Sequence, residues 1–450
     1  MNRYIPTTED DRRRMLGVIG AASVDELFSG IPEQVRQKER SDLPKPLSEM
    51  EMMRDLNELA GWNLSSDDLF CFLGAGVYDH FIPSAVDSLV SRAEFTTSYT
   101  PYQPEVAQGT LQSIFQYQTM VCELTGMDIS NASMYDGASA AAEAAVLASA
   151  ATKRRRVLCG RGVHPQTRET LRTYCWSRNL EYEEIPLKDG TTDRAALAKA
   201  LAAGDAATLV VQTPNFLGLL EELSPLAESV HGAGGLMVAS TDLIALGTIE
   251  APGKLGADIV VGDGQTAGNP MNFGGPAFGF FAVKKPLMRR MPGRICGQTT
   301  DSQGRRTFVL TLQAREQHIR REKATSNICS NQNLCIVAAS VYLSLMGPHG
   351  LRELGEQVLA KTAYAVDQLE KTGKFRRAFP GAPSFRETVL LCDEPPAELN
   401  ARLIEAGVLG GLDLSAEYPE FKNAWLLAVT ESRTREEIDY MVTVAGGDEE

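Results

Sequence analysis

Residues 262–281, GDGQTAGNPMNFGGPAFGFF, form a segment rich in glycine and proline that follows the apolar run ADIVV. Glycine allows a ligand or another chain to approach the backbone closely, and proline fixes the turns between the glycines. Such a loop is typical of one wall of an active site. It contains no lysine, histidine or cysteine. The loop therefore offers backbone groups rather than a nucleophilic side chain.

A second candidate is the sequence YDGASA at 135–140, which begins a run of small helix-forming residues. Small residues at a helix start leave backbone N–H groups open to an anion, so this end could bind a phosphate. Asp136 could instead cap the helix through its own carboxylate. The residues leave both interpretations open and favour capping.

Two further segments gather polar side chains. The segment at 96–105, TTSYTPYQPE, holds Tyr99 and Tyr102 between prolines in a stiff turn, which favours a functional or interface role over local packing. The segment at 321–329, REKATSNIC, joins two predicted domains, where clefts commonly form. Capping of the following helix explains its hydroxyl and amide groups as well as ligand contact does.

Several common catalytic motifs are absent from the sequence. It has no Walker loop, no G-x-S-x-G and no H-E-x-x-H, and GDGQTAG only partly matches the dinucleotide fingerprint. The five histidines are isolated along the chain and are expected to be structural. The eight cysteines form no C-x-x-C pair, which predicts reduced thiols and no metal site.

The composition is that of an ordinary globular protein, with 450 residues, 43% hydrophobic content and a net charge of -14. The acidic balance argues against a nucleic-acid partner. The one basic run, 153–156, is expected to complement a helix C-terminus. The sequence shows no signal peptide and no apolar stretch of about 18 residues. We therefore expect a soluble, cytoplasmic protein that binds no membrane.

Strand-like apolar runs alternate with helical stretches from about residue 70 to residue 300. The runs expected to be strands are 157–159, 209–213, 236–240, 258–262 and 278–283. The stretches expected to be helices are 138–152, 194–202 and 226–231. This alternation predicts a mostly parallel α/β sheet with helices on both faces. In such sheets the ligand lies beyond the carboxyl ends of the strands.

The pattern divides the chain into three parts. Residues 1–65 are predicted to form an N-terminal helical arm with little core of its own, and residues 66–310 the large α/β domain. Residues 311–450 are predicted to form a small C-terminal α+β domain. Its expected elements are helices at 332–345, from 351 onward and at 435–444, and strands within SFRETVLLC and AWLLAVTE.

Seven segments together resemble the P-protein family of the glycine cleavage system, the pyridoxal-phosphate-dependent glycine dehydrogenase (decarboxylating). They are YIPTTEDDRRRML, FLGAGVYDHFIPSAV, YTPYQPEVAQGTLQSIFQYQT, NASMYDGASAAAEA, GDGQTAGNPMNFGGPAFGFFAV, REKATSNICSNQNL and GLRELGE. The resemblance covers essentially the whole chain. It implies the aspartate-aminotransferase-like fold, fold type I of pyridoxal-phosphate enzymes. Within the family, the chain is most similar to the alpha subunit of the split bacterial form, in which two homologous half-length chains assemble.

The resemblance also indicates what this chain lacks. In catalytically competent members, the loop that corresponds to 262–281 carries the lysine that holds pyridoxal phosphate as a Schiff base. Alignment places Gln265 or Thr266 there, and neither side chain forms an imine. The acid that pairs with the pyridinium nitrogen is replaced by Ala239, although Asp242 follows three residues later. We therefore expect no catalytic residue in this chain, and neither Lys254 nor Lys284 is expected to substitute.

The resemblance implies a role in a larger enzyme. A second subunit would hold pyridoxal phosphate, and an α2β2 complex would decarboxylate glycine, release CO2 and transfer the aminomethyl group to the lipoyl arm of H-protein. Active sites of this fold lie at a dimer interface, so Gly274, Gly275, Tyr99 and Tyr102 are predicted to approach the partner's cofactor. The alternatives are a structural or regulatory paralogue that only stabilises its partner, and a self-sufficient enzyme with an unexpected lysine.

Overall fold

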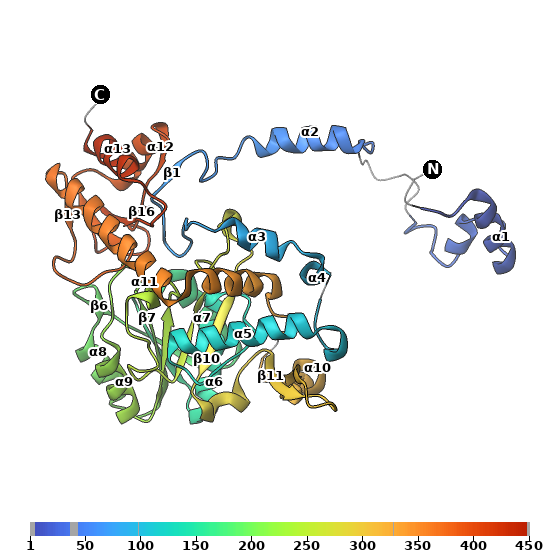
Figure 1. Ribbon diagram of the computed structural model, residues 1–450, viewed down its shortest axis with the longest axis horizontal. Coiled ribbons are helices and arrows are strands. Elements are labelled where there is room, and N and C mark those ends of the chain that lie inside the picture. The colour runs from blue at the N-terminus through green and yellow to red at the C-terminus, as the bar shows by residue number, and fades with distance from the viewer. Residues whose placement is uncertain (1–4, 37–43, 98, 327, 448–450) are drawn as a thin grey trace. The chain divides into compact units, whose positions relative to one another are not determined.

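The computed structural model describes residues 5–36, 44–97, 99–326 and 328–447, and the chain divides into two units, 1–64 and 65–450 (Figure 1). Ser98 and Asn327, which belong to two of the candidate segments, lie outside the described residues. The predicted boundary near residue 310 falls inside the second unit and stays a prediction.

The described residues of the first unit form two α-helices, each begun by a capping box. In α1 (Glu9–Ile19) the hydroxyl of Thr8 accepts from the amide of Asp11, whose carboxylate accepts from the amide of Thr8. Helix α2 (Glu49–Ala60) begins in the same way at Ser48. No described residue of this unit is buried. Local capping and not core packing therefore defines its helices.

The second unit is organised around a seven-stranded sheet. The order is β2-β10-β9-β8-β7-β3-β4, in which β2 and β10 run antiparallel to their neighbours and the other five strands are parallel. The strand bounds are β2 Ile129–Ser130, β3 Arg156–Gly160, β4 Glu181–Ile185, β7 Ala206–Thr213, β8 Leu236–Thr241, β9 Ile259–Asp263 and β10 Gly279–Val283. All five predicted strands of this region are confirmed.

Successive side chains along the central strands enter two different cores. Leu209 and Val211 pack with one set of helices, whereas Val210 between them packs with the other set. The first core contains residues of α5 (Gln108–Thr125), α8 (Arg194–Leu201), α9 (Leu223–Gly232) and α11 (Asn333–Lys371). The second contains residues of α6 (Gly137–Thr152) and α7 (Pro165–Ser177). The sheet is thus covered on both faces, as predicted (Figure 1).

The C-terminal part adds a four-stranded antiparallel sheet of order β13-β14-β17-β16. Its strands are β13 Phe375–Arg377, β14 Glu387–Cys392, β16 Leu412–Asp413 and β17 Ala424–Ala428, and its helices are α12 Pro396–Glu405 and α13 Arg435–Gly446. Residues of these helices and of the end of α11 form one core with β14 and β17. The predicted strands and terminal helix are present.

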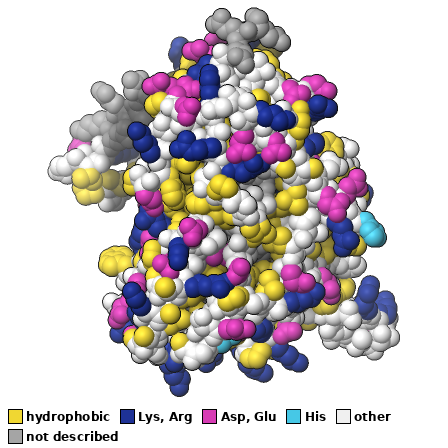
Figure 2. Space-filling model, turned by 90° about the vertical axis from the view of Figure 1, so that its left-hand side faces the viewer, with side chains coloured by type: hydrophobic (Ala, Val, Ile, Leu, Met, Phe, Trp, Pro, Cys, Tyr) yellow, Lys and Arg dark blue, Asp and Glu magenta, His cyan; other side chains and the backbone are white. Residues whose placement is uncertain are grey.

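The remaining elements of the second unit are short. They are the helices α3 Ser84–Val90, α4 Ala93–Thr96 and α10 Gln317–Arg320, and the strand pairs β1 Phe70–Cys71 with β15 Val408–Leu409, β5 Leu187–Lys188 with β6 Thr191–Thr192, and β11 Ile295–Thr300 with β12 Arg306–Thr311. Acidic and basic side chains are interspersed on the face drawn in Figure 2.

Helix α11 contains the break that the sequence predicts. Helix α11 is interrupted at Gly347, whose φ of 58° is not helical, so the predicted break before Pro348 is present. Among the described residues, α11 is also the one helix long and apolar enough to cross a membrane, but 44% of that apolar window is buried inside the protein.

After α6, Arg154 of the basic run donates to the carbonyl oxygens of Ala206 and Ala233 at 3.0 and 2.6 Å. This arginine thus ties the start of β7 to the end of α9 through their carbonyl oxygens.

Candidate functional site

A cavity of about 590 Å³ lies at the carboxyl ends of β7, β8 and β9, where the sheet topology predicts a ligand site. The N-terminal end of α6, the loop 271–277 and the segment 75–78 also line it. Its charged side chains are the four carboxylates of Asp136, Asp242, Asp263 and Glu387 and the one guanidinium of Arg386. The cavity therefore carries an excess of negative charge.

Gln265 occupies the position predicted to replace the Schiff-base lysine, and its side chain joins two loops. Its carboxamide accepts from the amide of Tyr78 at 3.0 Å and donates to the carbonyl oxygens of Tyr78 and Asn269 at 3.1 and 2.8 Å. Thr266 donates its hydroxyl to Asp242 at 3.1 Å. Both side chains are buried and fully engaged with protein partners. In this protein the two side chains hold neighbouring segments together through these hydrogen bonds.

No lysine lines this cavity in the described part of the chain. Lys254, one of the two nearest in sequence, pairs with Glu250 at 2.9 Å on the surface. The other, Lys284, lies 3.4 Å from Asp258 beside the start of β9, the end remote from the cavity. Neither amine is therefore placed to form an imine here.

The N-terminus of α6 is closed by two carboxylates of this chain. Asp136 is the N-cap and accepts from the amide of Ser139 at 2.7 Å. Asp263 accepts from the amides of Gly137 and Gln265 at 3.1 and 2.9 Å. A Cβ atom at residue 137 would lie only 2.7 Å from the backbone nitrogen of Asp263, so glycine permits this close approach. Of the two interpretations of YDGASA, the structure shows capping.

Asp263 carries its charge in an unfavourable environment. Burial, and further the charges of Asp136 and Asp242, raise its pKa to about 6. A phosphate group at this helix end would displace Asp263 from the amide of Gly137 and meet the same carboxylates. Three observations point to the same conclusion. Asp263 occupies the amide of Gly137 at the helix end, no described lysine lines the cavity, and the buried Ala239 of β8 stands where an acid is expected to pair with the pyridinium nitrogen. The residues of this cavity do not fit pyridoxal phosphate.

Asp242 is held by a different set of partners. Its carboxylate caps the turn after β8 by accepting from the amides of Ile244 and Ala245, and it pairs with Arg386 at 3.2 Å. Burial alone would raise the pKa of Asp242, but the guanidinium of Arg386 and these amides lower it below its ordinary value. Asp242 is therefore an ion-pair partner within the protein, although its side chain also lines the cavity.

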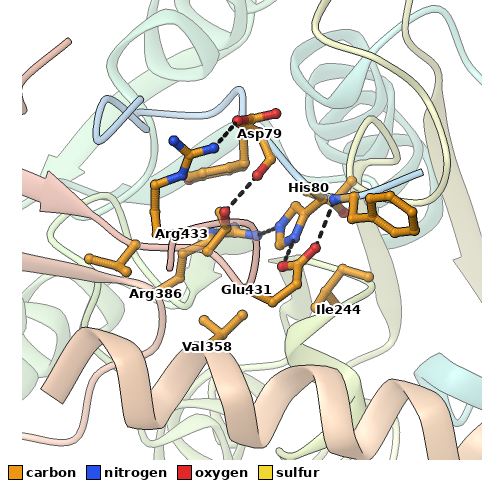
Figure 3. Close-up of polar contacts among 12 residues, drawn as sticks. Asp79, His80, Ile244, Val358, Arg386, Glu431 and Arg433 are labelled. Carbon is orange, nitrogen blue, oxygen red and sulfur yellow. Dashed lines mark hydrogen bonds and ion pairs between the residues drawn. The ribbon is translucent and has the colours of Figure 1, made fainter. Parts of the chain in front are cut away.

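A row of charged residues continues from Arg386 to the C-terminal strands (Figure 3). Arg386 contacts Nε2 of His80 at 3.1 Å, and Nδ1 of His80 lies 2.6 Å from Glu431. Arg433 binds Asp79 at 2.8 Å. The row ties residues 79–80 to the segment after β17. His80 has a protein partner on each ring nitrogen, as expected for a structural histidine.

Tyr78 and His164 complete the aromatic part of the wall. The guanidinium carbon of Arg386 lies 3.3 Å from the ring centre of Tyr78, whose hydroxyl donates to Glu387 at 2.9 Å. His164 caps α7 and places Nε2 2.8 Å from the carbonyl oxygen of Ala75. Burial lowers the pKa of His164. These groups are also engaged inside the protein.

The predicted partner-facing residues lie in two places. Gly274 and Gly275 line the cavity on the loop 271–277, with φ of 102° and 152°, values that favour glycine. Their amides donate within the loop, to the carbonyl oxygens of Met271 and Asn272. Phe273, directly before Gly274, is 84% exposed. The loop therefore exposes the backbone of Gly274 together with the side chains of Asn272, Phe273 and Pro276.

Tyr99 and Tyr102 do not line the cavity. Tyr99 is 82% exposed, and its hydroxyl lies 3.4 Å from that of Ser330. Tyr102 accepts from buried Arg294 at 2.7 Å and packs its ring 6.0 Å from that of His318. Their predicted approach to a partner's cofactor remains a prediction.

The roles of Tyr78, Arg386 and Glu387 were not predicted from the sequence. A signal was available for two of them, because Arg386 and Glu387 form a charged pair at the start of the otherwise apolar run TVLLC. Charged residues next to a buried strand require partners, and the ends of strands are where sites lie. Tyr78 carries no comparable signal.

Comparisons with known proteins agree along the whole chain. A family model described as "Glycine cleavage system P-protein" matches residues 2–445. Proteins named "Probable glycine dehydrogenase (decarboxylating) subunit 1" from Geobacillus thermodenitrificans and Geobacillus kaustophilus are 52% and 53% identical over 446 residues, 99% of each chain. A protein of the same name from Moorella thermoacetica is 51% identical over 444 residues, again 99% of each chain.

The solved structures place the fold. The crystal structure of glycine decarboxylase (P-protein) in inhibitor-bound form superposes with a TM-score of 0.92 at 43% identity and 99% coverage of each chain. A sphingosine-1-phosphate lyase from Burkholderia pseudomallei shares only the fold, with a TM-score of 0.64 at 13% identity and 93% coverage of each chain. The architecture is fold type I of pyridoxal-phosphate enzymes. The chain belongs to the glycine cleavage system P-protein family.

Proposed function

We propose that this chain is subunit 1 of a two-chain glycine decarboxylase and that the second subunit holds the pyridoxal phosphate. The observation that carries the proposal is that Gln265 stands at the expected lysine position and that its carboxamide is hydrogen-bonded to Tyr78 and Asn269. The name of the relatives, subunit 1, supports a second chain. With that chain, the enzyme would decarboxylate glycine and transfer the aminomethyl group to the lipoyl arm of H-protein.

This chain would contribute walls and positioning surfaces to the assembled enzyme. Gly274 and Gly275 are proposed to lie against the partner's cofactor, because both line the cavity and carry no side chain of their own. Tyr99 and Tyr102 are proposed to contact the partner or the lipoyl arm. An α2β2 assembly and a cytoplasmic location belong to the same proposal, and the eight free cysteine thiols suit a reducing compartment.

The proposal is tested by producing the full chain alone and together with a homologous chain that carries the lysine. We expect the chain alone to show no aldimine absorbance, no borohydride-trapped pyridoxyl adduct and no CO2 release from glycine. The two chains together should show all three, with the adduct on the second chain. A pyridoxyl adduct on this chain alone, active on glycine, would contradict the proposal.

The contribution of the loops needs a separate variant. Tyr99→Ala removes an exposed ring without disturbing the core and should lower turnover in the assembled enzyme at least several-fold. Trp176→Ala is the matched control, since Trp176 is 81% exposed on α7. Assembly is followed by gel filtration. Unchanged turnover with intact assembly would remove Tyr99 from the proposed role.

A further inference from the structure

A second cavity, of about 210 Å³, is lined by residues of α6 and α7, two helices that pack against each other on one face of the large sheet (Figure 1). Glu143 of α6 lines it and is only 5% exposed. One carboxylate oxygen accepts from the hydroxyl of Ser326 at 2.7 Å. The other, Oε2, has no hydrogen-bond partner among the described residues.

A buried carboxylate oxygen without a partner is an unusual feature. Buried charges in proteins are normally paired or hydrogen-bonded, because transfer from water into the interior is otherwise unfavourable. Burial accordingly raises the pKa of Glu143, and the nearby Arg178 opposes this rise. A cationic ligand group at Oε2 would supply the missing partner.

The hydroxyl groups around this carboxylate are also oriented as acceptors. Ser139, Thr173 and Ser177 line the cavity, and each donates its single hydroxyl proton to a backbone carbonyl oxygen at 2.9 to 3.1 Å. A hydroxyl that has donated its proton has only lone pairs left to offer. These acceptors, of which Ser139 is buried and Thr173 and Ser177 are exposed, favour a donor-rich group such as an ammonium, which has three N–H bonds.

The cavity also has a positive group on its exposed side. Arg178, directly after α7, lines the cavity and is solvent-exposed. Its guanidinium forms no hydrogen bond or ion pair with any residue of the described ranges. Arginine binds carboxylates through paired N–H donors. One cavity thus contains an unpartnered carboxylate oxygen and an unpartnered guanidinium.

We propose that this cavity binds a small α-amino acid as its zwitterion, with the ammonium at Glu143 and the carboxylate at Arg178. The volume of about 210 Å³ corresponds to roughly seven water molecules at about 30 Å³ each, which suits an amino acid with a small side chain. The rings of Tyr135 and Tyr174 line the cavity beside the two charged groups. The site is separate from the proposed function and requires no partner chain.

The first test is calorimetric titration of the full chain, purified alone, with glycine, methylammonium and acetate. Glycine should bind at one saturable site. Methylammonium and acetate should each bind at least 10-fold more weakly, because each meets only one of the two charged groups. Absence of glycine binding, or methylammonium binding as tight as glycine, would overturn the proposal. Because turnover is not measured, a failed decarboxylation assay leaves this result interpretable.

Two variants locate the site. Arg178→Ala changes an exposed residue, and Glu143→Gln removes the charge while keeping the shape of the side chain. Each should weaken glycine binding at least 10-fold, whereas Arg289→Ala, an exposed arginine of the segment Lys285–Arg290, should leave it unchanged. Glycine binding to Arg178→Ala at wild-type affinity would overturn the proposal, even if Glu143→Gln failed to fold.

The pH dependence adds a third readout. The ammonium binds the ionised form of Glu143, whose pKa is raised in the free protein, so glycine affinity should fall as the pH decreases through that pKa. The titratable and charged groups around Glu143 are Tyr135, Tyr174 and Arg178. Burial raises the pKa of Tyr174 above its ordinary value, which is already well above pH 8. A pH-independent affinity between pH 4 and pH 8 would contradict the assigned role of Glu143.

Discussion

Helix α6 borders two cavities that differ in whether their charged side chains have partners within the protein. In the larger cavity at its N-terminus, Asp263 and Asp136 accept backbone amides and Asp242 pairs with Arg386. In the smaller cavity along the helix, neither one carboxylate oxygen of Glu143 nor the guanidinium of Arg178 has a partner among the residues that the structure describes. The charged side chains of the larger cavity therefore have partners within the protein, whereas in the smaller cavity two charged groups lack such partners among the described residues.

This difference separates a scaffold from a binding site. Where the chain supplies its own partners, an incoming ligand must displace hydrogen bonds that already exist, and the cavity is closed to ligands such as phosphate. Where a buried group lacks a partner, a ligand adds an interaction without removing one. Variants that remove a partner therefore test the larger cavity through stability rather than through binding.

The largest effect is expected for Arg386→Met, which keeps most of the side-chain volume and removes the charge. Asp242 would remain buried without its ion-pair partner, and the guanidinium over Tyr78 would be lost. Breaking a buried ion pair from one side destabilises proteins by about 3–5 kcal/mol. Urea unfolding measures the loss, and Arg178→Met, at an exposed and unpaired arginine, should change stability by no more than about 0.5 kcal/mol. Similar losses in the two variants would remove the distinction drawn between the cavities.

A pH-dependent effect is expected for Asp263→Asn. The folded-state pKa of Asp263 is raised to about 6, above the unfolded value of about 3.9, so the ionised carboxylate destabilises the folded state. The wild type should therefore lose up to about 3 kcal/mol relative to the variant as the pH rises from about 4 to above 6. Unfolding at pH 4.5, 5.5, 6.5 and 7.5 measures this slope.

The control for this slope is Asp193→Asn. Asp193 caps α8, and its pKa is lowered by the backbone amide of Ala196. Its ionised form stabilises the folded state, and this contribution is fully present above the unfolded pKa of about 3.9 and is lost only below it, so the stability difference between the wild type and this variant should stay nearly constant from about pH 5 to pH 7.5. An equally constant difference for Asp263→Asn would show that Asp263 is not held in an unfavourable environment.

The sequence predicts the central sheet because each strand is a short apolar run, and burial on both faces requires such runs. It predicts α6 and its cap because Asp136 stands directly before small helix-forming residues. The hairpin of β11 and β12 at 295–311 was not predicted. Its strands mix exposed polar residues with few buried ones, so they carry no clear apolar alternation.

The partners within the larger cavity lie beyond sequence reasoning for a topological reason. Gln265 meets Tyr78 across 187 positions, and Arg386 meets Asp242 across 144. Local periodicity carries no information on which loops the strand order brings together. The resemblance to a family located Gln265, but only the structure shows that its carboxamide joins two loops. Tyr99 and Tyr102 lie outside this cavity, and their predicted approach to a partner stays a prediction.

The smallest effect is expected at the cap of α6, where Asp136→Ala removes a capping box. Loss of an N-cap costs about 1 kcal/mol, and Thr434→Ala, which removes the capping box of α13, is the matched variant. The two should diverge with pH. Because the charge of Asp136 raises the pKa of Asp263, its removal relieves a repulsion above about pH 6, so Asp136→Ala should cost less at pH 7.5 than at pH 5. Thr434→Ala should cost the same at both values.

Addition of phosphate tests the alternative that the N-terminus of α6 binds an anion, because a helix end that binds phosphate would be stabilised by it. With Asp263 still bonded to Gly137, neither variant should gain stability from phosphate, and a gain confined to Asp136→Ala would show that the cap alone had excluded the anion.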